Sequence, residues 1–334
     1  MREMLKIAVF NVGRKCFGNT VLQLPFFVAL KQHYPDCEIT LFTSQQTSQV
    51  LLFDGCVDQI ISDRKVSPVR LSSMIKMGGY DLLFNLRRTS GRIHLSCALS
   101  GMSNKYAYTT NRFHDVFYKK NVVFDKCTMY PAMAYLSLLN EVTDSQYRTD
   151  IIRTLTPASK QFPNALTLLP GGSSVEKKWP IGHYIKAAEQ LVCDEQLKNK
   201  IEQVNIVLGP QEEEYLSQIP KSIGTVPVCI HKQPSVKQLV ELASQSVLAL
   251  SNDCGPGHIF QMSKVPMVVL FGWIDGVSPY HVIQEWFLSH NHSCAVTPDA
   301  ELKHIETIPV EKVVGIAKVM ANTDHANHTD KQSQ

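Results

Sequence analysis

A loop near the start of the chain has almost the spacing of a phosphate-binding P-loop. From Gly13 the sequence runs through four residues to Gly18, Asn19 and Thr20. A P-loop requires lysine where Asn19 stands, because the lysine side chain carries positive charge to the phosphates. The amide at this position argues against hydrolysis of a nucleoside triphosphate on this loop.

Two pairs of basic residues could meet an anionic ligand. Arg14 and Lys15 lie in the same first loop, where binding of acceptor phosphates and plain solvation are equally consistent with the sequence. Arg87 and Arg88 follow the apolar run YDLLFNL. If that run is a strand of a parallel sheet, both arginines lie at its carboxyl end, where such sheets bind ligands. This position slightly favours a binding role for Arg87 and Arg88.

A loop in the second half, SNDCGPGH, has groups suited to a pyrophosphate. It follows an apolar run and opens a predicted helix, whose free N–H groups and dipole favour a phosphate. Asp253 or Asn252 can cap this helix, and His258 lies one turn into it. The same residues also suit a plain strand-turn-helix connection, which physical arguments alone favour slightly.

Two further loops could contact the same ligand. In PGGSSVEKKWP, small residues including Ser173 let a ligand approach the backbone, and Lys177 can neutralise a leaving diphosphate. A flexible loop with solvated lysines is the alternative. In IVLGPQEEEYL, Glu212 could accept hydrogen bonds from ribose hydroxyls. The alternative is that the acidic residues simply favour a helix N-terminus.

The elements that would position these loops follow a β-α-β order. In the first half, apolar runs predict strands and amphipathic spacing predicts helices. The predicted strands are 6–12, 38–44, 57–62, 80–86 and 104–110, and the predicted helices are 20–35 and 92–101. This order predicts a mainly parallel sheet covered by helices.

The same alternation restarts after a polar stretch that contains Pro157 and Pro163 and suits a linker. The predicted strands are 165–171, 203–209, 226–231, 246–252 and 265–272, and the predicted helices are 181–192, 212–219, 235–245, one from 255, and 310–322. The prediction is therefore an α/β fold of two Rossmann-like doubly wound domains facing a central cleft. The expected domains are 1–155 and 156–321, and 322–334 is expected to be a disordered polar tail.

Composition narrows the class of protein. Apolar residues make up 44% of the 334 residues, and no apolar run approaches the roughly 18–20 residues of a membrane span. Nine cysteines without a C-x-x-C pair favour a reducing cytoplasm, and the twelve histidines include no H-E-x-x-H metal motif.

The net charge of +3 is unevenly distributed. Residues 1–150 hold 18 basic and 12 acidic residues, whereas 151–334 hold 15 and 18. The basic half could face an anionic substrate or membrane surface, or could be an ordinary solvated surface. Nucleic acid is disfavoured because the basic residues form no long run or known motif.

Three segments resemble glycosyltransferase family 9, whose best-known members are ADP-heptose:lipopolysaccharide heptosyltransferases. They are FGNTVLQLPFFVALKQHYPDCEITLFT, PGGSSVEKKWPIGHYIKAAEQL and SVKQLVELASQSVLALSNDCGPGHIFQMSKVPMVVLFG. The resemblance covers nearly all of 5–320, and SNDCGPGH followed by VPMVVLFG is its most specific part. It implies a GT-B fold, in which the second domain binds most of the sugar nucleotide.

The resemblance also implies residue roles on the donor side. Asp253, Cys254, Gly255 and His258 would lie at the donor diphosphate and sugar; the family usually has Ser or Thr in place of Cys254. Ser173 and Lys177 would meet the phosphates, and Glu212, or its neighbour Glu213, the ribose. Lys177 and Asp253 would take part in catalysis. No metal and no cofactor besides the nucleotide-sugar substrate, with ADP-heptose the first candidate, is implied.

On the acceptor side, the resemblance explains the opening loop. The family usually has Gly-Asp before an apolar stretch and Pro, and its Asp is thought to be the general base. Gly18 and Asn19 occupy that place, with Pro25 following, and a neutral amide cannot hold the proton. Another group, such as His258 or Asp275, could act as the base. The acceptor could also be acidic or carry its own base, or the chain could bind the donor and transfer little.

These observations together favour a metal-independent, inverting glycosyltransferase. It would transfer a sugar, heptose first, to lipopolysaccharide or another surface glycan, as a cytoplasmic protein peripheral to the inner membrane. Acceptor contacts would come from Arg14, Lys15, Gly18, Asn19, Arg87 and Arg88. The first alternative is a sugar-nucleotide-binding protein with little transferase activity. A dinucleotide-dependent oxidoreductase ranks lower, because no G-x-G-x-x-G follows a predicted strand.

Overall fold

The computed structural model describes residues 4–12, 16–109, 112–123, 129–156 and 164–329. The chain divides into two compact units, Met1–Ile152 and Arg153–Gln334. The sequence-based boundary was expected after residue 155. Each unit is described by itself.

Unit 1 is built on a six-stranded parallel sheet in the order β3-β2-β1-β4-β5-β6. The strands are β1 Lys6–Phe10, β2 Glu38–Thr43, β3 Gln59–Ser62, β4 Leu82–Asn85, β5 Lys105–Thr109 and β6 Lys120–Val123. This is the strand order of a doubly wound Rossmann sheet. The strand order reverses between β1 and β4. Such sheets bind ligands beyond the carboxyl ends of the two strands on either side of this reversal.

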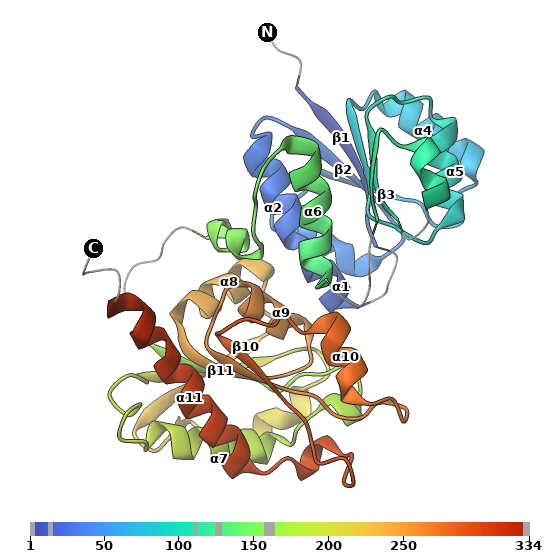
Figure 1. The fold of residues 1–334 in the computed structure, drawn as a ribbon. Coiled ribbons are helices and arrows are strands. Elements are labelled where there is room, and N and C mark those ends of the chain that lie inside the picture. The colour runs from blue at the N-terminus through green and yellow to red at the C-terminus, as the bar shows by residue number, and fades with distance from the viewer. Residues whose placement is uncertain (1–3, 13–15, 110–111, 124–128, 157–163, 330–334) are drawn as a thin grey trace. The chain divides into compact units, whose positions relative to one another are not determined.

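Helices cover both faces of this sheet. On one face α2 Leu24–His33 packs beside α6 Pro131–Thr143, and on the other α4 Pro68–Gly78 packs beside α5 Gly91–Leu99 (Figure 1). The rings of Phe26 and Phe84 meet edge to face at 5.4 Å beneath α2. The short helices α1 Phe17–Val21 and α3 Gln49–Phe53 lie in the loops after β1 and β2.

Unit 2 contains a seven-stranded sheet in the order β13-β12-β11-β7-β8-β10-β9. The strands are β7 Ala165–Leu169, β8 Gln203–Leu208, β9 Ser222–Ile223, β10 Val226–Lys232, β11 Ser246–Asn252, β12 Met267–Leu270 and β13 Ser293–Val296. All pairings are parallel except that of the edge strand β9 with β10. The long, buried apolar strands follow from this topology, because both faces of a parallel sheet are covered.

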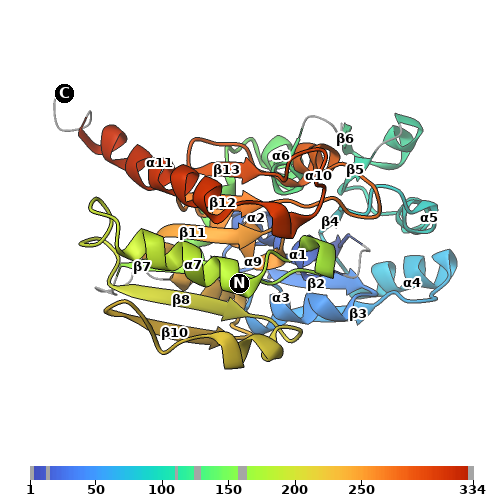
Figure 2. The same cartoon turned by 90° about the horizontal axis from the view of Figure 1, so that it is seen from below.

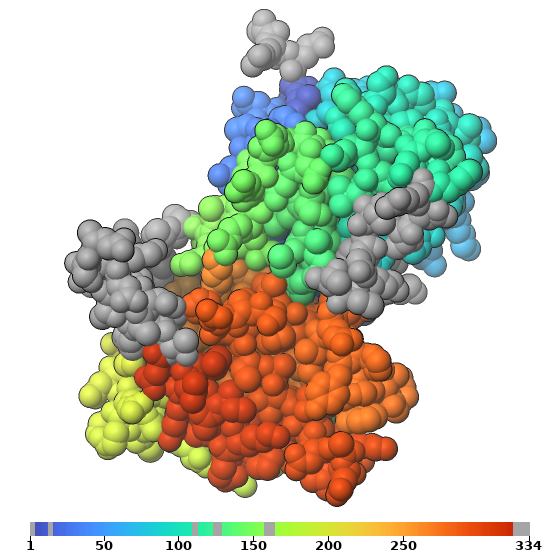
Figure 3. All heavy atoms as spheres, viewed as in Figure 1, coloured from blue at the N-terminus to red at the C-terminus, as the bar shows by residue number. Residues whose placement is uncertain are grey.

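One face of this sheet packs on α7 Ile181–Val192 and α11 Val310–Thr329, which lie side by side across the strands (Figure 2). The other face carries α8 Val236–Gln245 and α9 Gly255–Met262. The face of unit 2 seen in the space-filling view consists largely of the red and orange segments that follow β11 (Figure 3). α10 Pro279–Trp286 belongs to these segments.

Trp179 anchors the α7 and α11 side of the sheet. Its side chain is fully buried and donates a hydrogen bond from Nε1 to the Ile308 carbonyl at 3.1 Å. Tyr184 of α7 packs against the indole at 5.1 Å between ring centroids. The buried Trp179 therefore fixes the position of the KKWP segment, although the two lysines before it are polar.

Some elements were not predicted from the sequence: the helices α3, α4, α6 and α10 and the strands β6, β9 and β13. The predicted helix over 212–219 is a 3-10 helix, Glu213–Gln218. Other 3-10 turns are Gln46–Ser48, Arg112–Phe117, Thr149–Leu155, Val175–Lys177 and Ile305–Thr307. α11 continues to Thr329, beyond the predicted helix end at residue 322, and the expected disordered tail over 322–334 stays a prediction. No Gly or Pro follows Gly315 to end this helix earlier.

Among the described residues, no helix is long and apolar enough to cross a membrane.

Candidate donor site and acceptor loop

The carboxyl edge of the unit 2 sheet brings together the loops singled out in the sequence. Strand β7 lies between β11 and β8 in the sheet. The loops 170–178, 209–212 and 253–254 therefore leave neighbouring strands at the same edge. Parallel α/β sheets bind ligands beyond this carboxyl edge.

Asn252, the last residue of β11, joins two of these loops through its side-chain amide. Its Oδ1 accepts hydrogen bonds from the Trp179 backbone N–H at 3.1 Å and the Tyr184 hydroxyl at 2.8 Å. Its Nδ2 donates to the Pro170 carbonyl at 2.8 Å and to the Gly171 carbonyl at 3.3 Å. The residue is fully buried. The loop that carries the lysines is thereby held in register with the end of β11.

The expectation that Asp253 or Asn252 caps the following helix is wrong. The N-cap residue of α9 is Cys254, and no side chain there accepts a capping hydrogen bond. The physical reason is that both candidate side chains have other partners: Asn252 bonds the 170–179 loop, and Asp253 pairs with a lysine.

Lys177 and Asp253 form an ion pair at this edge. Their Nζ and Oδ2 atoms lie 2.5 Å apart, and the side chains are 20% and 9% exposed. Lys177 is the last residue of the 3-10 turn Val175–Lys177. The partly exposed ammonium is held in place by the carboxylate, and it stays accessible to an anion that approaches from solvent.

A second ion pair lies beside the first. The Lys178 ammonium contacts Oε1 of Glu212 at 2.7 Å, and the two side chains are 13% and 4% exposed. Oε2 of Glu212 accepts the Gly209 N–H at 3.0 Å. A Cβ at Gly209 would lie 2.7 Å from this oxygen, so a side chain there would force the carboxylate aside. Glu212 thus lies at the predicted edge, but both of its oxygens have partners within the chain.

The start of α9 holds two titratable groups that are neutral at ordinary pH. Burial raises the pKa of the Cys254 thiol to about 11, so the sulfur is not a thiolate. Burial lowers the pKa of His258 to about 4, so its ring is not an imidazolium. Both neutral groups leave the positive charge of this edge to the two lysines.

The loop that carries Lys177 passes close to the end of β12. A Cβ at Gly272 would lie 2.4 Å from the Glu176 carbonyl oxygen, closer than real Cβ contacts. Glycine at this position therefore permits the lysine loop to lie against the sheet edge. Ser173, the predicted phosphate contact in the same loop, is exposed.

In unit 1, Arg87 does not project freely from its strand end. It is 9% exposed, donates from Nε to the Asn11 carbonyl at 2.9 Å, and pairs through Nη1 with the buried carboxylate of Asp63. Arg92 adds a second guanidinium 3.3 Å from the same carboxylate oxygen. Burial lowers the pKa of Arg87, and the charge of Asp63 opposes that shift.

This buried group links the ends of β1, β3 and β4. Asn11, Asp63 and Arg92 were not identified from the sequence, although Asn11 and Asp63 each stand at the carboxyl end of a predicted strand. Their position at the ends of predicted strands is the sequence feature that could have identified these two residues. A role of Arg87 in acceptor binding stays a prediction. Its described contacts connect the segments that follow β1 and β3 to the end of β4.

The opening loop is partly described. Arg14 and Lys15 lie outside the described residues. Gly18 and Asn19 lie in α1, where the Asn19 carbonyl accepts a hydrogen bond from Gln23 Nε2 at 2.7 Å. Arg88 is half-buried, and its carbonyl contacts His94 Nε2 at 3.1 Å.

Within the described ranges, no group of three or more His, Cys, Asp or Glu side chains could hold a metal ion. The carboxylates at the sheet edge are instead close to ammonium groups.

The sequence profile of glycosyltransferase family 9 (heptosyltransferase) matches residues 97–303 of the chain. The chain belongs to glycosyltransferase family 9. It is therefore a glycosyltransferase, as predicted, and the loops 170–178, 209–212 and 253–254 lie inside the matched region.

Two relatives of this family 9 glycosyltransferase match over nearly their whole length. Lipopolysaccharide heptosyltransferase 3 of Escherichia coli K12 is 22% identical over 350 residues, which cover 95% of this chain and 98% of the relative. Lipooligosaccharide heptosyltransferase 2 of Campylobacter jejuni is 24% identical over 335 residues, covering 92% and 96%.

A solved structure of an Escherichia coli heptosyltransferase with ADP is similar in fold. It superposes with a TM-score of 0.63 at 14% identity and covers 95% of this chain and 100% of that one. The likeness confirms the predicted fold class, an α/β protein of GT-B type with two Rossmann-like domains.

The buried ion pairs of unit 1 give a stability prediction. Asp63→Asn removes the charge that offsets Arg87 and should lower the free energy of unfolding by about 3 kcal/mol, because a lone buried charge remains. The matched control is Glu141→Gln, which breaks the half-exposed pair with Lys120 and should cost less than about 1 kcal/mol. Urea unfolding of both variants provides the measurement. Equal losses in the two variants would contradict a structural role for Asp63.

The close approach at Gly272 gives a second prediction. Gly272→Ala should lower the free energy of unfolding by about 1–3 kcal/mol, because the added methyl group forces the Glu176 backbone aside. Gly182→Ala is the control: this glycine lies in α7 with nothing within 4 Å of an added Cβ, and alanine favours a helix by about 1 kcal/mol over glycine. Thermal unfolding should therefore shift in opposite directions. A Gly272→Ala protein as stable as the wild type would refute the packing argument.

Proposed function

We propose that this family 9 glycosyltransferase transfers a sugar from a nucleotide-sugar donor, ADP-heptose being the first candidate, to a lipopolysaccharide-type acceptor. The observation that carries the proposal is the pair of partly buried lysines held by carboxylates beside the start of α9. The names of the two relatives, heptosyltransferases of lipopolysaccharide and lipooligosaccharide, support the sugar and the acceptor class.

In the proposed donor site, Lys177 and Lys178 supply positive charge to the pyrophosphate. Each ammonium already has a carboxylate partner, Asp253 or Glu212, which positions it before the donor arrives. The start of α9 adds the positive end of the helix dipole. Groups placed in advance at the leaving group stabilise the charge that develops there in the transition state.

The proposed reaction inverts the anomeric centre. The acceptor hydroxyl oxygen attacks the anomeric carbon from the face opposite the pyrophosphate. The bond from that carbon to the phosphate oxygen breaks, and the nucleoside diphosphate leaves with the bonding electrons. The hydroxyl proton must pass to a base. His258, a candidate from the sequence, is neutral, but burial lowers its pKa to about 4 and makes it a weak base. It would take up the proton only as the forming bond makes the hydroxyl strongly acidic.

The proposed setting is the cytoplasmic face of the inner membrane. The first 150 residues carry an excess of six positive charges, from 18 basic and 12 acidic residues. Such an excess attracts anionic lipid and the phosphates of a lipopolysaccharide core. The acceptor contacts expected from Gly18, Asn19, Arg88 and the basic opening loop belong to this half of the chain.

Nucleotide binding provides the central test. One of ADP, UDP, GDP and CDP should raise the Tm, as a ligand present at about 100 times its Kd stabilises by about 2.7 kcal/mol. Lys177→Met should weaken that binding about tenfold or more, whereas Lys198→Met should not, because Lys198 pairs with an exposed glutamate on the surface. Absence of stabilisation by all four nucleotides, or normal binding by Lys177→Met, would refute the proposed donor site.

A second candidate function rests on Asn19, where the family usually has an aspartate. A chain without that base could bind the sugar nucleotide and transfer the sugar slowly, since general-base assistance contributes about 10²–10⁴-fold. If the missing carboxylate limits the rate, Asn19→Asp should raise kcat by about tenfold or more, and Asn19→Ala should not. The measurement is mass-detected transfer from ADP-heptose to a heptose-deficient core acceptor. Unchanged turnover in Asn19→Asp would instead assign the proton transfer to a group elsewhere.

A further inference from the structure

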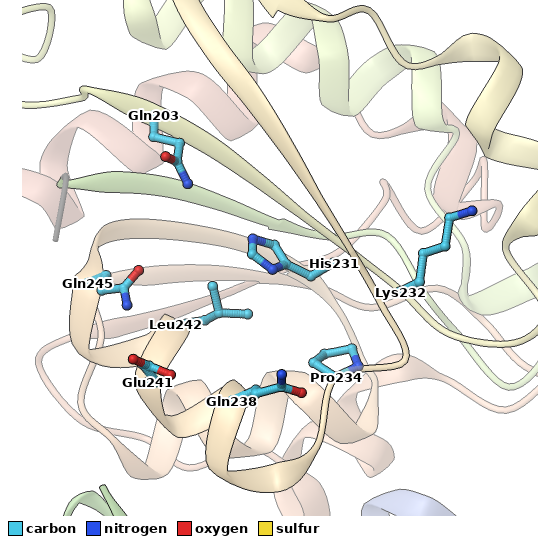
Figure 4. Close-up of a pocket in the computed structure, with 8 residues that line it drawn as sticks. All are labelled: Gln203, His231, Lys232, Pro234, Gln238, Glu241, Leu242 and Gln245. Atoms are coloured by element: carbon cyan, nitrogen blue, oxygen red, sulfur yellow. The ribbon is translucent and has the colours of Figure 1, made fainter. Parts of the chain in front are cut away.

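The face of the unit 2 sheet opposite α7 and α11 contains a polar cavity. It has a volume of about 430 Å³ and lies between β10 and α8, with Gln203 of β8 at one end (Figure 4). The side chain of His231 enters it from β10, and those of Gln238, Glu241 and Gln245 from α8. The volume is within the range of small-molecule sites.

The strand register explains why this face is polar. Parallel partners Thr167, Asn205 and Cys229 point to one side of the sheet, and their neighbours Leu166, Leu168, Val204 and Ile206 point to the apolar core on the other. α8 packs on α9 and on β7. The polar side chains on this face of β8 and β10, Gln203 and His231, therefore line the cavity.

A buried amide behind the lining, Asn205, is bonded to two of the lining side chains. Asn205 is fully buried, and its Oδ1 accepts hydrogen bonds from Gln203 Nε2 at 2.6 Å and His231 Nε2 at 3.0 Å. Its Nδ2 has no hydrogen-bond partner among the described residues. Exchanging the oxygen and nitrogen of the amide leaves one end unmatched in the same way. Asn205 does not itself line the cavity, so its effect is to fix the Gln203 and His231 side chains in place before a ligand binds.

The chemistry of the lining selects a neutral, hydroxyl-rich ligand. Glutamine amides both donate and accept hydrogen bonds, as hydroxyl groups do. Glu241 places a negative charge at the cavity, and the Lys232 side chain runs away from the other lining side chains (Figure 4). A phosphate would meet no concentrated positive charge. Pro234 and Leu242 add apolar surface for the C–H groups of a ring.

We propose that this cavity binds a neutral pyranose ring of a sugar. It is distinct from the proposed donor site. None of its lining residues belongs to the loops that carry the paired lysines and their carboxylates. The cavity runs from the amino edge of the sheet, at Gln203 and Gln245, to the end of β10 at His231 and Lys232. The proposal therefore holds or fails independently of the donor assignment.

Saturation-transfer-difference NMR with methyl α-D-mannopyranoside and methyl α-D-glucopyranoside tests the proposal on the full chain. Excess ADP is present to occupy a nucleotide site. The wild type should give a signal for at least one glycoside, with a Kd of about 1 mM, which corresponds to about 4 kcal/mol of binding. Glu241→Ala and Gln245→Ala should each reduce the signal about fivefold or more.

Lys237→Ala is the matched control, because Lys237 is exposed on the same helix and does not line the cavity. It should bind as the wild type does, and all three variants should unfold at the wild-type temperature. A signal that ADP abolishes would place the sugar in the nucleotide site and overturn the proposal. Equal signals in the cavity variants and the control, or no signal from the wild type, would overturn it as well.

Discussion

The arrangement of the loops at the carboxyl edge of the unit 2 sheet depends on one buried amide. Asn252 satisfies two donors and two acceptors with a single side chain, and these groups come from the loop after β7 and from the start of α7. A hydrophobic residue of similar size would leave all of them unpaired in a dry environment, where each costs free energy. The amide therefore converts the end of a strand into a fixed reference point for the neighbouring lysine loop.

The two ion pairs illustrate how a site can be held ready without a ligand. Lysine side chains lose much conformational freedom when they are fixed, and a carboxylate partner can meet that cost during folding. The carboxylates also lower the net positive charge, so that an anion must compete with them for the ammonium groups. The glycines at 209 and 272 allow this close arrangement, because their neighbours occupy the space that a side chain would need.

Much of the fold followed from the sequence, because buried parallel strands produce apolar runs that are easily recognised. The predicted strands from KIAVF to VPMVVLF correspond to strands in the structure, and their order in the chain placed Lys177, Glu212 and Asp253 at one sheet edge. Their roles toward a ligand stay predictions. The partners were not predictable, because they depend on distances across the fold: Lys178 pairs with Glu212, and Asn252 bonds a loop instead of capping α9.

The buried arginine of unit 1 shows the same limit. Arg87 stands at the expected strand end, but the sequence could not indicate that Asp63, 24 residues away, neutralises it in the interior. α4 escaped prediction for a different reason: its buried residues are few, so its apolar stripe is weak. Its start signal was present in the sequence, since Ser67 caps the helix and Pro68 follows it.

The antiparallel strand β9 has a consequence for how copies of the chain meet. A strand at the border of a sheet offers unpaired N–H and C=O groups that can recruit another chain. β9 pairs with β10 only at Val226 and Pro227, and the later residues of β10 pair on one side with β8. The exposed lysine at position 232 lies in that uncovered part. This charge disfavours edge-to-edge pairing of β10 strands from two copies of the chain, because the two lysines would be brought close together.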